Sequence, residues 1–252
     1  MHGKTVIILG ASRGIGAETA ELLAARQARI LLIARNGGEL KKLLDSLPGT
    51  DHSHLVLDLA ESESAHSIME HCKQWGIPDI VVWNYFARSD LGRLSQLQAN
   101  SLSGAISRNC EVPLALYRGF LPEQKNQKFG RWILVSSAIA GLSGPGQGVY
   151  GAVKSVQESL IRTIAVEQGH NEITGNIVRP GFIDTPGVQQ NYDSQTRQKL
   201  ASMNLPARAG SPKEVAAAIG YLASDQAGFV NGTVLPVDGG MNLGWFLRRE
   251  SK

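Results

Sequence analysis

Tyr150 and Lys154 are the two side chains of this sequence whose types and spacing best suit proton chemistry. They stand four residues apart, and a helix places side chains at that spacing on one face. A tyrosine with an ordinary pKa of about 10 is a weak acid catalyst at neutral pH, but an ammonium group one turn away favours the phenolate and lowers that pKa. The spacing therefore predicts a general acid/base pair, although the same pair on a solvated helix face would be only a surface contact.

A serine is expected beside this pair. Ser137 lies 13 residues before Tyr150 and follows the apolar run from Trp132 to Val135, which is typical of a strand buried on both faces. Ligands of α/β folds bind at the carboxyl ends of parallel strands, so the Ser137 hydroxyl should face the same crevice as Tyr150 and Lys154.

Ser137 and the motif Y-x-x-x-K at Tyr150 and Lys154 resemble the active site of the short-chain dehydrogenase/reductase family. That family reduces carbonyls or oxidises alcohols with a nicotinamide cofactor. The resemblance implies that Asn109, in a helix predicted over 101–124, is a fourth catalytic residue that bends the helix through a water and connects Lys154 to solvent. The residues alone leave open a buried asparagine that caps or kinks this helix, and Pro113 favours local distortion.

A glycine-rich segment, G-A-S-R-G-I-G from Gly10 to Gly16, follows the apolar run from Val6 to Leu9 and precedes a helical pattern. Glycines let the backbone approach a pyrophosphate closely, and a helix N-terminus attracts its charge, although an ordinary tight turn would have the same composition. The spacing G-x-x-x-G-x-G resembles that of the family, with Leu9 in place of its usual threonine. The resemblance places cofactor contacts at Gly10, Ser12, Arg13, Gly14, Ile15 and Gly16.

The second predicted strand, Ile30 to Ile33, indicates the cofactor preference. NAD-selective sites carry an acidic residue after this strand to bind the ribose 2′-hydroxyl, whereas this chain has Arg35. Arg35 and Arg13 could instead contact a 2′-phosphate through their guanidinium groups. The sequence therefore favours NADP(H) over NAD(H), although Arg35 could simply cap a solvated turn.

Two further segments resemble cofactor-binding segments of the family. The third predicted strand, Leu55 to Leu57, ends at Asp58 and Leu59, which the resemblance places beside the adenine; Asp58 could also be the N-cap of the next helix. The sixth predicted strand, Gly175 to Arg179, leads into P-G-F-I-D-T, which resembles the P-G-x-I-x-T segment around the nicotinamide. The residues implied there are Pro180, Gly181, Ile183 and Thr185. The resemblance also implies that Tyr150 and Lys154 contact the cofactor, with Lys154 on the nicotinamide ribose.

The segment after the fourth predicted strand, Ile80 to Trp83, departs from the family. The family pattern is N-N-A-G, and this chain has Trp83, Asn84, Tyr85 and Phe86. Asn84 is expected to stay in the cofactor site, but Phe86 replaces a glycine that lets the backbone pass close to the cofactor ribose. Either the backbone is displaced here, or Tyr85 and Phe86 form the wall of an unusual substrate cleft.

The C-terminal third suggests a lid, a capped helix and a contact surface. Residues 186–204 have no strong period and are expected to form a mobile lid over the substrate. Ser211 as N-cap with Glu214 at the third helical position predicts a helix start. The tail over 241–252 carries apolar residues that are expected to pack on a neighbouring subunit of a homotetramer or homodimer, the family's usual state. These are Trp245, Phe246 and Leu247.

Length and composition limit the remaining possibilities. A chain of 252 residues is typical of a single-domain doubly wound Rossmann fold, an α/β fold with a central parallel sheet flanked by helices, and we expect residues 1–252 to form one NADP(H)-binding domain. No apolar run reaches the roughly 18 to 20 residues of a membrane span, and the chain begins without a signal-peptide pattern, so a cytoplasmic location is expected. Two cysteines without metal-ligand spacing predict no metal site, and a scattered net charge of +3 argues against nucleic acid.

The C-terminal half, around L-P-A-R-A-G-S-P-K-E-V, most resembles 3-oxoacyl-[acyl-carrier-protein] reductases. The predicted function is therefore NADPH-dependent reduction of a 3-oxoacyl thioester of fatty acid or polyketide type, with Lys128 and Arg131 available to an acidic carrier protein. A sugar, a steroid or another secondary alcohol or ketone is the alternative substrate. A non-catalytic NADP(H)-binding regulatory protein is the alternative from another class.

Overall fold

A parallel β-sheet forms the centre of the computed structural model, which describes residues 1–88, 92–202 and 204–243. Its seven strands have the order β3-β2-β1-β4-β5-β6-β7, and all neighbouring pairs are parallel. The strands are β1 (Thr5–Leu9), β2 (Arg29–Ala34), β3 (Ser53–Val56), β4 (Ile80–Trp83), β5 (Gly130–Val135), β6 (Ile173–Pro180) and β7 (Val234–Val237).

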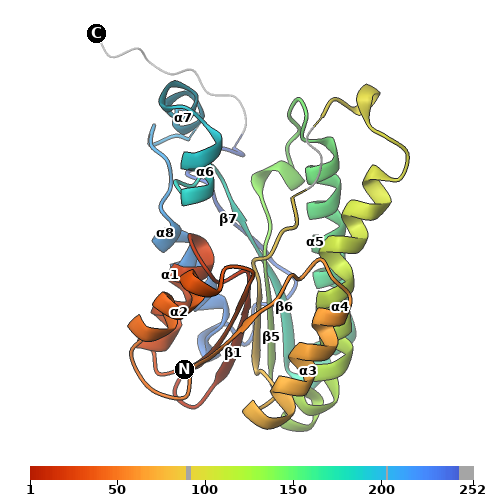
Figure 1. Ribbon diagram of the computed structural model, residues 1–252, viewed down its shortest axis with the longest axis vertical. Coiled ribbons are helices and arrows are strands. Elements are labelled where there is room, and N and C mark those ends of the chain that lie inside the picture. Colours follow the sequence, from red (N-terminus) through yellow and green to blue (C-terminus); the bar gives the residue numbers. More distant parts are fainter. Residues whose placement is uncertain (89–91, 203, 244–252) are drawn as a thin grey trace.

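Helices cover both faces of this sheet (Figure 1). One face carries α1, α2 and α8, and the other carries α3, α4 and α5. The helices are α1 (Ile15–Ala25), α2 (Gly37–Ser46), α3 (Glu63–Trp75), α4 (Ser101–Gln127), α5 (Gly148–Gln168), α6 (Pro186–Asn191), α7 (Ser194–Ala201) and α8 (Pro212–Leu222). The predicted doubly wound Rossmann fold is confirmed.

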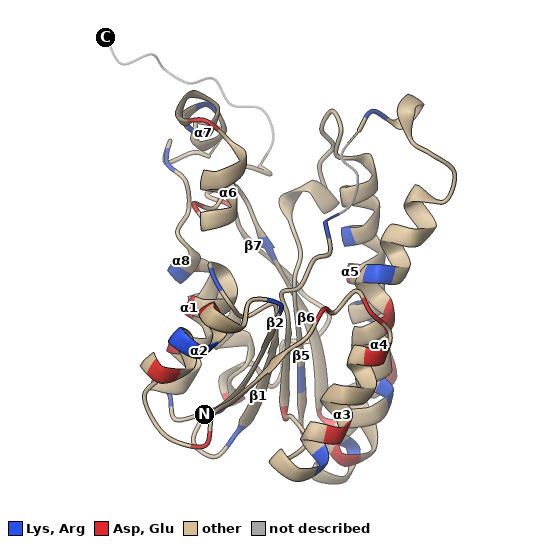
Figure 2. Ribbon diagram, in the orientation of Figure 1, with Lys and Arg blue, Asp and Glu red and all other residues tan. Residues whose placement is uncertain are grey.

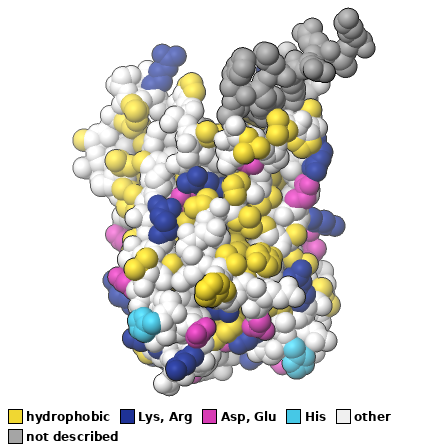
Figure 3. Space-filling model, turned by 180° about the vertical axis from the view of Figure 1, so that it is seen from behind, with side chains coloured by type: hydrophobic (Ala, Val, Ile, Leu, Met, Phe, Trp, Pro, Cys, Tyr) yellow, Lys and Arg dark blue, Asp and Glu magenta, His cyan; other side chains and the backbone are white. Residues whose placement is uncertain are grey.

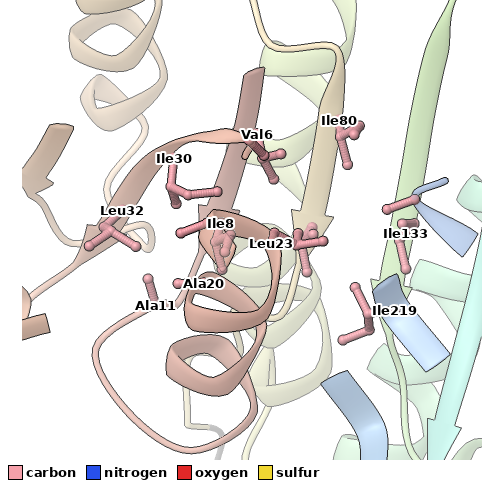
Figure 4. Close-up of a cluster of buried hydrophobic side chains, with 14 of the residues drawn as sticks. Val6, Ile8, Ala11, Ala20, Leu23, Ile30, Leu32, Ile80, Ile133 and Ile219 are labelled. Carbon is pink, nitrogen blue, oxygen red and sulfur yellow. The ribbon is translucent and has the colours of Figure 1, made fainter. Parts of the chain in front are cut away.

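The apolar strands have two buried faces because helices pack on each. Alternate β1 residues point to opposite sides, with Ile8 in the cluster under α1 and α8, and Ile7 in the cluster under α3, α4 and α5. Figure 4 shows the first cluster, in which Leu23 of α1 and Ile219 of α8 lie over the sheet. Burial of both faces of the sheet explains why the sequences of these strands are continuous hydrophobic runs.

The strand order reverses between β1 and β4, and this reversal positions the site. β1 connects through α1 to β2 on one side, while β4 lies on its other side in register, with Leu9 opposite Trp83. A crevice opens at the carboxyl ends of strands at such a point. The glycine segment after β1 and the W-N-Y-F segment after β4 both lie there.

The structure also corrects two expectations about local structure and adds helices to the predicted lid. Residues 186–204 are partly helical, because Thr185 accepts a hydrogen bond from the Val188 amide and Asp193 accepts one from the Thr196 amide, which begin α6 and α7. These two helices are too short for a periodic pattern to show in the sequence. Asp58 is not an N-cap, since α3 begins after Ser62. The third predicted strand ends one residue early, so Leu57 lies beyond β3.

The capping box that begins α8 is confirmed. Ser211 accepts from the Glu214 amide at 3.3 Å, and the Glu214 carboxylate accepts from the Ser211 amide at 2.7 Å. The apolar tail residues expected at a subunit contact lie outside the described residues.

Charges of both signs are interspersed over the helices and loops (Figure 2). The view from behind also shows basic, acidic and hydrophobic side chains, and several of the hydrophobic ones adjoin one another near its middle (Figure 3). Within residues 1–88, 92–202 and 204–243, none of the helices has the length and apolar character that crossing a membrane requires.

Candidate active site

The turn between β1 and α1 depends on three glycines. Gly10 and Gly14 have φ angles of +88° and +59°, in the region that side chains disfavour. A Cβ on Gly16 would lie 2.1 Å from the Gly10 carbonyl oxygen, so only glycine fits. Asn84 holds the turn from β4, donating from Nδ2 to that same oxygen at 2.7 Å. The turn thereby brings bare backbone to the N-terminus of α1, which favours a bound phosphate.

A cleft of about 470 Å³ runs over this turn. Nine of the sequence-predicted cofactor residues line it: Gly10, Ser12, Arg13, Gly14, Ile15, Arg35, Leu59, Asn84 and Thr185. Gly16 and Asp58 do not line the cleft but contact residues that do: Gly16 packs against Gly10, and Asp58 lies beside Arg35. The structure therefore gathers residues from five separate chain segments at one cleft.

Arg35 and Arg13 give the cleft its positive charge. The Arg35 guanidinium is largely exposed and lies 3.6 Å from the Asp58 carboxylate. Arg13 donates to the Gln190 side chain of α6 at 3.2 Å. Sequence reasoning missed Glu39, the third residue of α2, which lines the same cleft and opposes these cations. A glutamate in the first turn of a helix is common at protein surfaces, so the sequence did not indicate that Glu39 lines the cleft.

A second cavity of about 470 Å³ adjoins the first. Ser137, Tyr150 and Lys154 line it, from the end of β5 and from α5. Pro180, Gly181 and Ile183 line it from the segment after β6. Four residues line both spaces: Ile15, Asn84, Phe86 and Thr185. Much of the remaining wall is apolar and includes Ile139, Phe182 and Met241, together with Val188 and Leu200 from the predicted lid. Polar side chains also line it, namely Arg88, Ser136, Gln147, Asn191 and Tyr192.

Tyr150 and Ser137 interact across this cavity. Burial raises the pKa of Tyr150, and the hydrogen bond with Ser137 only partly offsets this effect. The lowered pKa that the spacing to Lys154 predicts is therefore wrong for this structure, because desolvation of the phenolate outweighs its stabilisation. The Ser137 oxygen accepts from the Ile139 amide at 3.2 Å, so its hydroxyl proton is free to be donated.

Lys154 is buried, with only 2% of its surface exposed. Its Nζ donates to the Val135 carbonyl oxygen at 2.9 Å and lies 5.1 Å from the centre of the Phe86 ring. Burial lowers the pKa of Lys154 to about 7, although Cys110 and Glu158 act in the opposite direction. Lys154 thus titrates near neutral pH.

Asn109 joins α4 to the segment after β4. Its Oδ1 accepts from the Ala87 amide at 2.7 Å, and its Nδ2 donates to the carbonyl oxygens of Ala87 at 3.2 Å and Ala105 at 2.8 Å. Pro113 has no amide hydrogen to bond the Asn109 carbonyl, and Gln157 of α5 donates to it at 3.2 Å instead. Asn109 therefore fixes the helix and loop around Lys154, while a water-linked relay through it remains a prediction.

Glu158, one turn beyond Lys154, is a buried carboxylate that sequence reasoning missed. Arg179 binds both of its oxygens, at 2.7 and 2.6 Å, and the Ser136 hydroxyl donates at 2.7 Å. Burial opposes ionisation, but the bonds from Arg179, Ser136 and Arg162 lower the pKa of Glu158 overall. This ion pair ties α5 to the carboxyl ends of β5 and β6, directly behind Ser137.

Tyr85 and Phe86, the two aromatic residues that depart from the family pattern, lie in different environments. Tyr85 is buried in the core and donates to the Arg108 carbonyl oxygen at 3.3 Å. Phe86 points into the site, where its ring meets the Tyr150 ring edge to face at a centroid distance of 4.8 Å. Tyr85 lines the nucleotide cleft, whereas Phe86 is the member of the pair that also lines the second cavity.

Metal-ligating side chains do not gather in the part of the chain that the structure describes, where no group of three or more His, Cys, Asp or Glu residues has a suitable arrangement. Cys72 and Cys110 are separate, buried thiols, and burial raises the pKa of both.

Comparisons with known proteins agree with this geometry. A family model described as Enoyl-(Acyl carrier protein) reductase matches residues 10–242. A solved structure described as a short chain dehydrogenase/reductase family protein superposes with a TM-score of 0.84 at 28% identity, over 94% of this chain and 97% of that one. The chain belongs to the short-chain dehydrogenase/reductase family.

Within this short-chain dehydrogenase/reductase family the similarity extends to named reductases. The 3-oxoacyl-[acyl-carrier-protein] reductase FabG of Pseudomonas aeruginosa is 33% identical over 246 residues, which cover 96% of this chain and 99% of that protein. The crystal structure of a 3-oxoacyl (acyl-carrier-protein) reductase from Agrobacterium tumefaciens C58 with NADP bound has a TM-score of 0.87 at 27% identity, over 94% of each chain. This chain is accordingly an oxidoreductase that resembles 3-oxoacyl-[acyl-carrier-protein] reductases.

Proposed function

We propose that the chain is an NADPH-dependent carbonyl reductase that converts a 3-oxoacyl thioester, bound to acyl carrier protein or coenzyme A, to the 3-hydroxyacyl product. The observation that carries this proposal is the continuity of the two cavities through Ile15, Asn84, Phe86 and Thr185. A dinucleotide that begins at the glycine turn would end beside Tyr150 and Ser137.

The adenosine and pyrophosphate half of NADP(H) fits the residues present. Gly10, Gly14 and Gly16 leave backbone uncovered at the N-terminus of α1, where a pyrophosphate is stabilised. Arg13 and Arg35 would hold the 2′-phosphate, because a guanidinium group binds phosphate oxygens through paired hydrogen bonds. Asp58 and Leu59 would flank the adenine.

NADPH, when bound, supplies the hydride for the carbonyl carbon. Tyr150 donates its phenolic proton to the carbonyl oxygen, and its raised pKa keeps that proton in place at neutral pH. The Ser137 hydroxyl donates a hydrogen bond to the same oxygen and stabilises the negative charge that develops there. Lys154 would contact the nicotinamide ribose and return a proton to Tyr150, with Asn109 fixing the surrounding backbone. Pro180, Gly181, Ile183 and Thr185 would border the nicotinamide.

The substrate assignment draws on the cavity wall and on the FabG relatives. Apolar side chains such as Phe182, Val188 and Leu200 suit an acyl chain, and α6 and α7 form the proposed lid. Lys128 and Arg131 were expected to be exposed for docking an acidic carrier protein. This prediction is wrong for Arg131, which is buried and donates to the carbonyl oxygens of Gly130 and Glu172. Lys128 remains exposed. A single domain, a homotetramer or homodimer, and a cytoplasmic location are parts of the same proposal.

The test measures oxidation of NADPH with acetoacetyl thioesters on acyl carrier protein and on coenzyme A, with NADH as the cofactor control. A cyclic ketone, a keto sugar and a keto steroid serve as substrate controls. We expect NADPH-dependent turnover that is faster on the carrier than on coenzyme A. Turnover of the cyclic or sugar ketone alone would replace the acyl substrate with another carbonyl, and NADPH binding without turnover of any of them would favour a regulatory protein.

A further inference from the structure

Phe86 occupies the boundary between the nucleotide cleft and the cavity that holds Tyr150 and Lys154. Its ring stands at 79° to the Tyr150 ring, with 4.8 Å between centroids. The Lys154 nitrogen lies 5.1 Å from the centre of the same ring. The ring therefore contacts both groups that the proposed mechanism requires.

The backbone on either side of Phe86 is held in place. Asn84 donates from its amide to the Leu9 carbonyl oxygen at 3.1 Å and from its side chain to Gly10 at 2.7 Å. Ala87 exchanges two hydrogen bonds with the Asn109 side chain, at 2.7 and 3.2 Å. Because the chain is fixed one residue after and two residues before Phe86, the ring can leave its position by rotating about its side-chain bonds, not by a shift of the strand end.

Lys154 is not among the residues that line the nucleotide cleft. Of the two cavities it lines the second; its Nζ donates to the Val135 carbonyl oxygen, and it is 2% exposed. Phe86 is partly exposed, lines both cavities, and has its ring centre 5.1 Å from that nitrogen. A ribose arriving from the cleft would meet the Phe86 ring before it reached Lys154.

We propose that Phe86 controls access of the nicotinamide ribose to Lys154 and Tyr150, so that its side chain must rotate aside before the nicotinamide half of NADP(H) binds. This inference rests on the proposed function, because it takes Lys154 as the ribose contact. It divides cofactor binding into two parts: the adenosine half enters a preformed cleft, and the nicotinamide half must displace an aromatic ring. A smaller residue at position 86 should therefore strengthen binding of the whole cofactor and leave its adenosine half unaffected.

The experiment compares dissociation constants of NADPH and of 2′,5′-ADP, which lacks the nicotinamide riboside, for the wild-type chain and for Phe86→Leu, Phe86→Ala and Phe86→Gly. NADPH affinity is expected to rise about tenfold in Phe86→Gly, less in Phe86→Ala and little in Phe86→Leu, as the contacts with Tyr150 and Lys154 are removed. The affinity for 2′,5′-ADP should stay within about twofold in all variants. Phe229→Gly, at a fully exposed phenylalanine, is the matched control for the substitution itself.

Chemical labelling gives a second readout that is independent of turnover. Acetylation of Lys154, followed by mass spectrometry, should be faster in Phe86→Gly than in wild type and should be suppressed when NADPH is added. Equal changes in the two dissociation constants, or weaker NADPH binding together with unchanged labelling, would overturn the role of Phe86 alone. If neither ligand binds any of the variants, both this inference and the proposed function fail.

Discussion

The Nζ of Lys154 lies 2.9 Å from the carbonyl oxygen of Val135, at the end of β5. The lysine is buried at a place where its positive charge is poorly solvated, and burial lowers its pKa to about 7. A protein that places a lysine here loses stability at neutral pH relative to one with an apolar side chain. The proposed role of Lys154 as a group that exchanges protons with Tyr150 would account for this cost.

Lys154→Met should stabilise the protein at neutral pH. Between pH of about 7 and 10.5 the unfolded chain binds more protons than the folded one, so wild-type stability rises with pH across this range. The free energy of unfolding of Lys154→Met should exceed that of wild type by roughly 1–4 kcal/mol at pH 7, allowing for one lost hydrogen bond. The difference should shrink by pH 10. Urea unfolding at both pH values measures it, with exposed Lys41→Met as the control; a difference that does not change with pH would contradict the prediction.

Tyr150→Phe tests the proton donor directly. The substitution removes the hydroxyl and keeps the ring that packs against Phe86, so the fold and the NADPH affinity should be preserved. Turnover should fall by at least about 100-fold, as expected when a general acid is lost. Steady-state rates with the substrate that wild type reduces best give the answer, and near-normal turnover would remove Tyr150 from the mechanism.

Glu158→Gln should destabilise the fold by about 3 kcal/mol, since it breaks a buried pair and leaves Arg179 without its carboxylate. The lowered pKa of Glu158 gives the sign of a pH effect: its stabilising contribution is present above pH of about 4.5 and is lost as the pH falls further. The variant should therefore lose less stability on acidification than wild type. Urea titrations at neutral and acidic pH test both points, and Asp45→Asn, in the exposed pair with Lys41, should change stability far less.

Asn109→Ala should loosen the segment that carries Phe86. The substitution leaves the Ala87 amide and carbonyl without their side-chain partner, which costs about 2–4 kcal/mol of unfolding free energy. Hydrogen exchange at the Ala87 amide should accelerate more than exchange elsewhere in the sheet. Asn126→Ala, at an exposed position near the end of the same helix, is the control, and unchanged exchange at Ala87 would contradict the role of Asn109 as an anchor.

The strands and the glycine turn could be predicted from the sequence because local pattern determines them. Strands buried on both faces read as apolar runs, as β1 and β4 do, and a turn that excludes any Cβ requires the glycine at Gly16. Tyr150 and Lys154 share one face of α5 for the same local reason. In each case a few adjacent residues contain the whole signal.

The features that the sequence did not reveal depend on long-range contacts. The pKa of Tyr150 depends on how deeply the folded chain buries it, and Glu158 acquires its role only when β6 brings Arg179 beside it. Arg131 was expected at the surface, yet the fold buries it against Phe129 and the carbonyl oxygen of Glu172. Burial and partners of charged side chains cannot be inferred from spacing along the chain.

Arg35→Ala should reduce the preference for NADPH over NADH. The guanidinium is exposed at the cleft and lies 3.6 Å from Asp58, so it can turn to a 2′-phosphate with little loss of internal contact. Loss of a charge-assisted contact to phosphate should weaken NADPH binding about 10- to 100-fold, while NADH, which has no 2′-phosphate, should bind with unchanged affinity. Fluorescence titrations of both cofactors measure the change. Lys42→Ala removes an exposed cation of α2 outside the cleft and is the control for a general effect of charge. If NADH binding is weakened equally in Arg35→Ala, Arg35 supports the cleft but does not bind the 2′-phosphate.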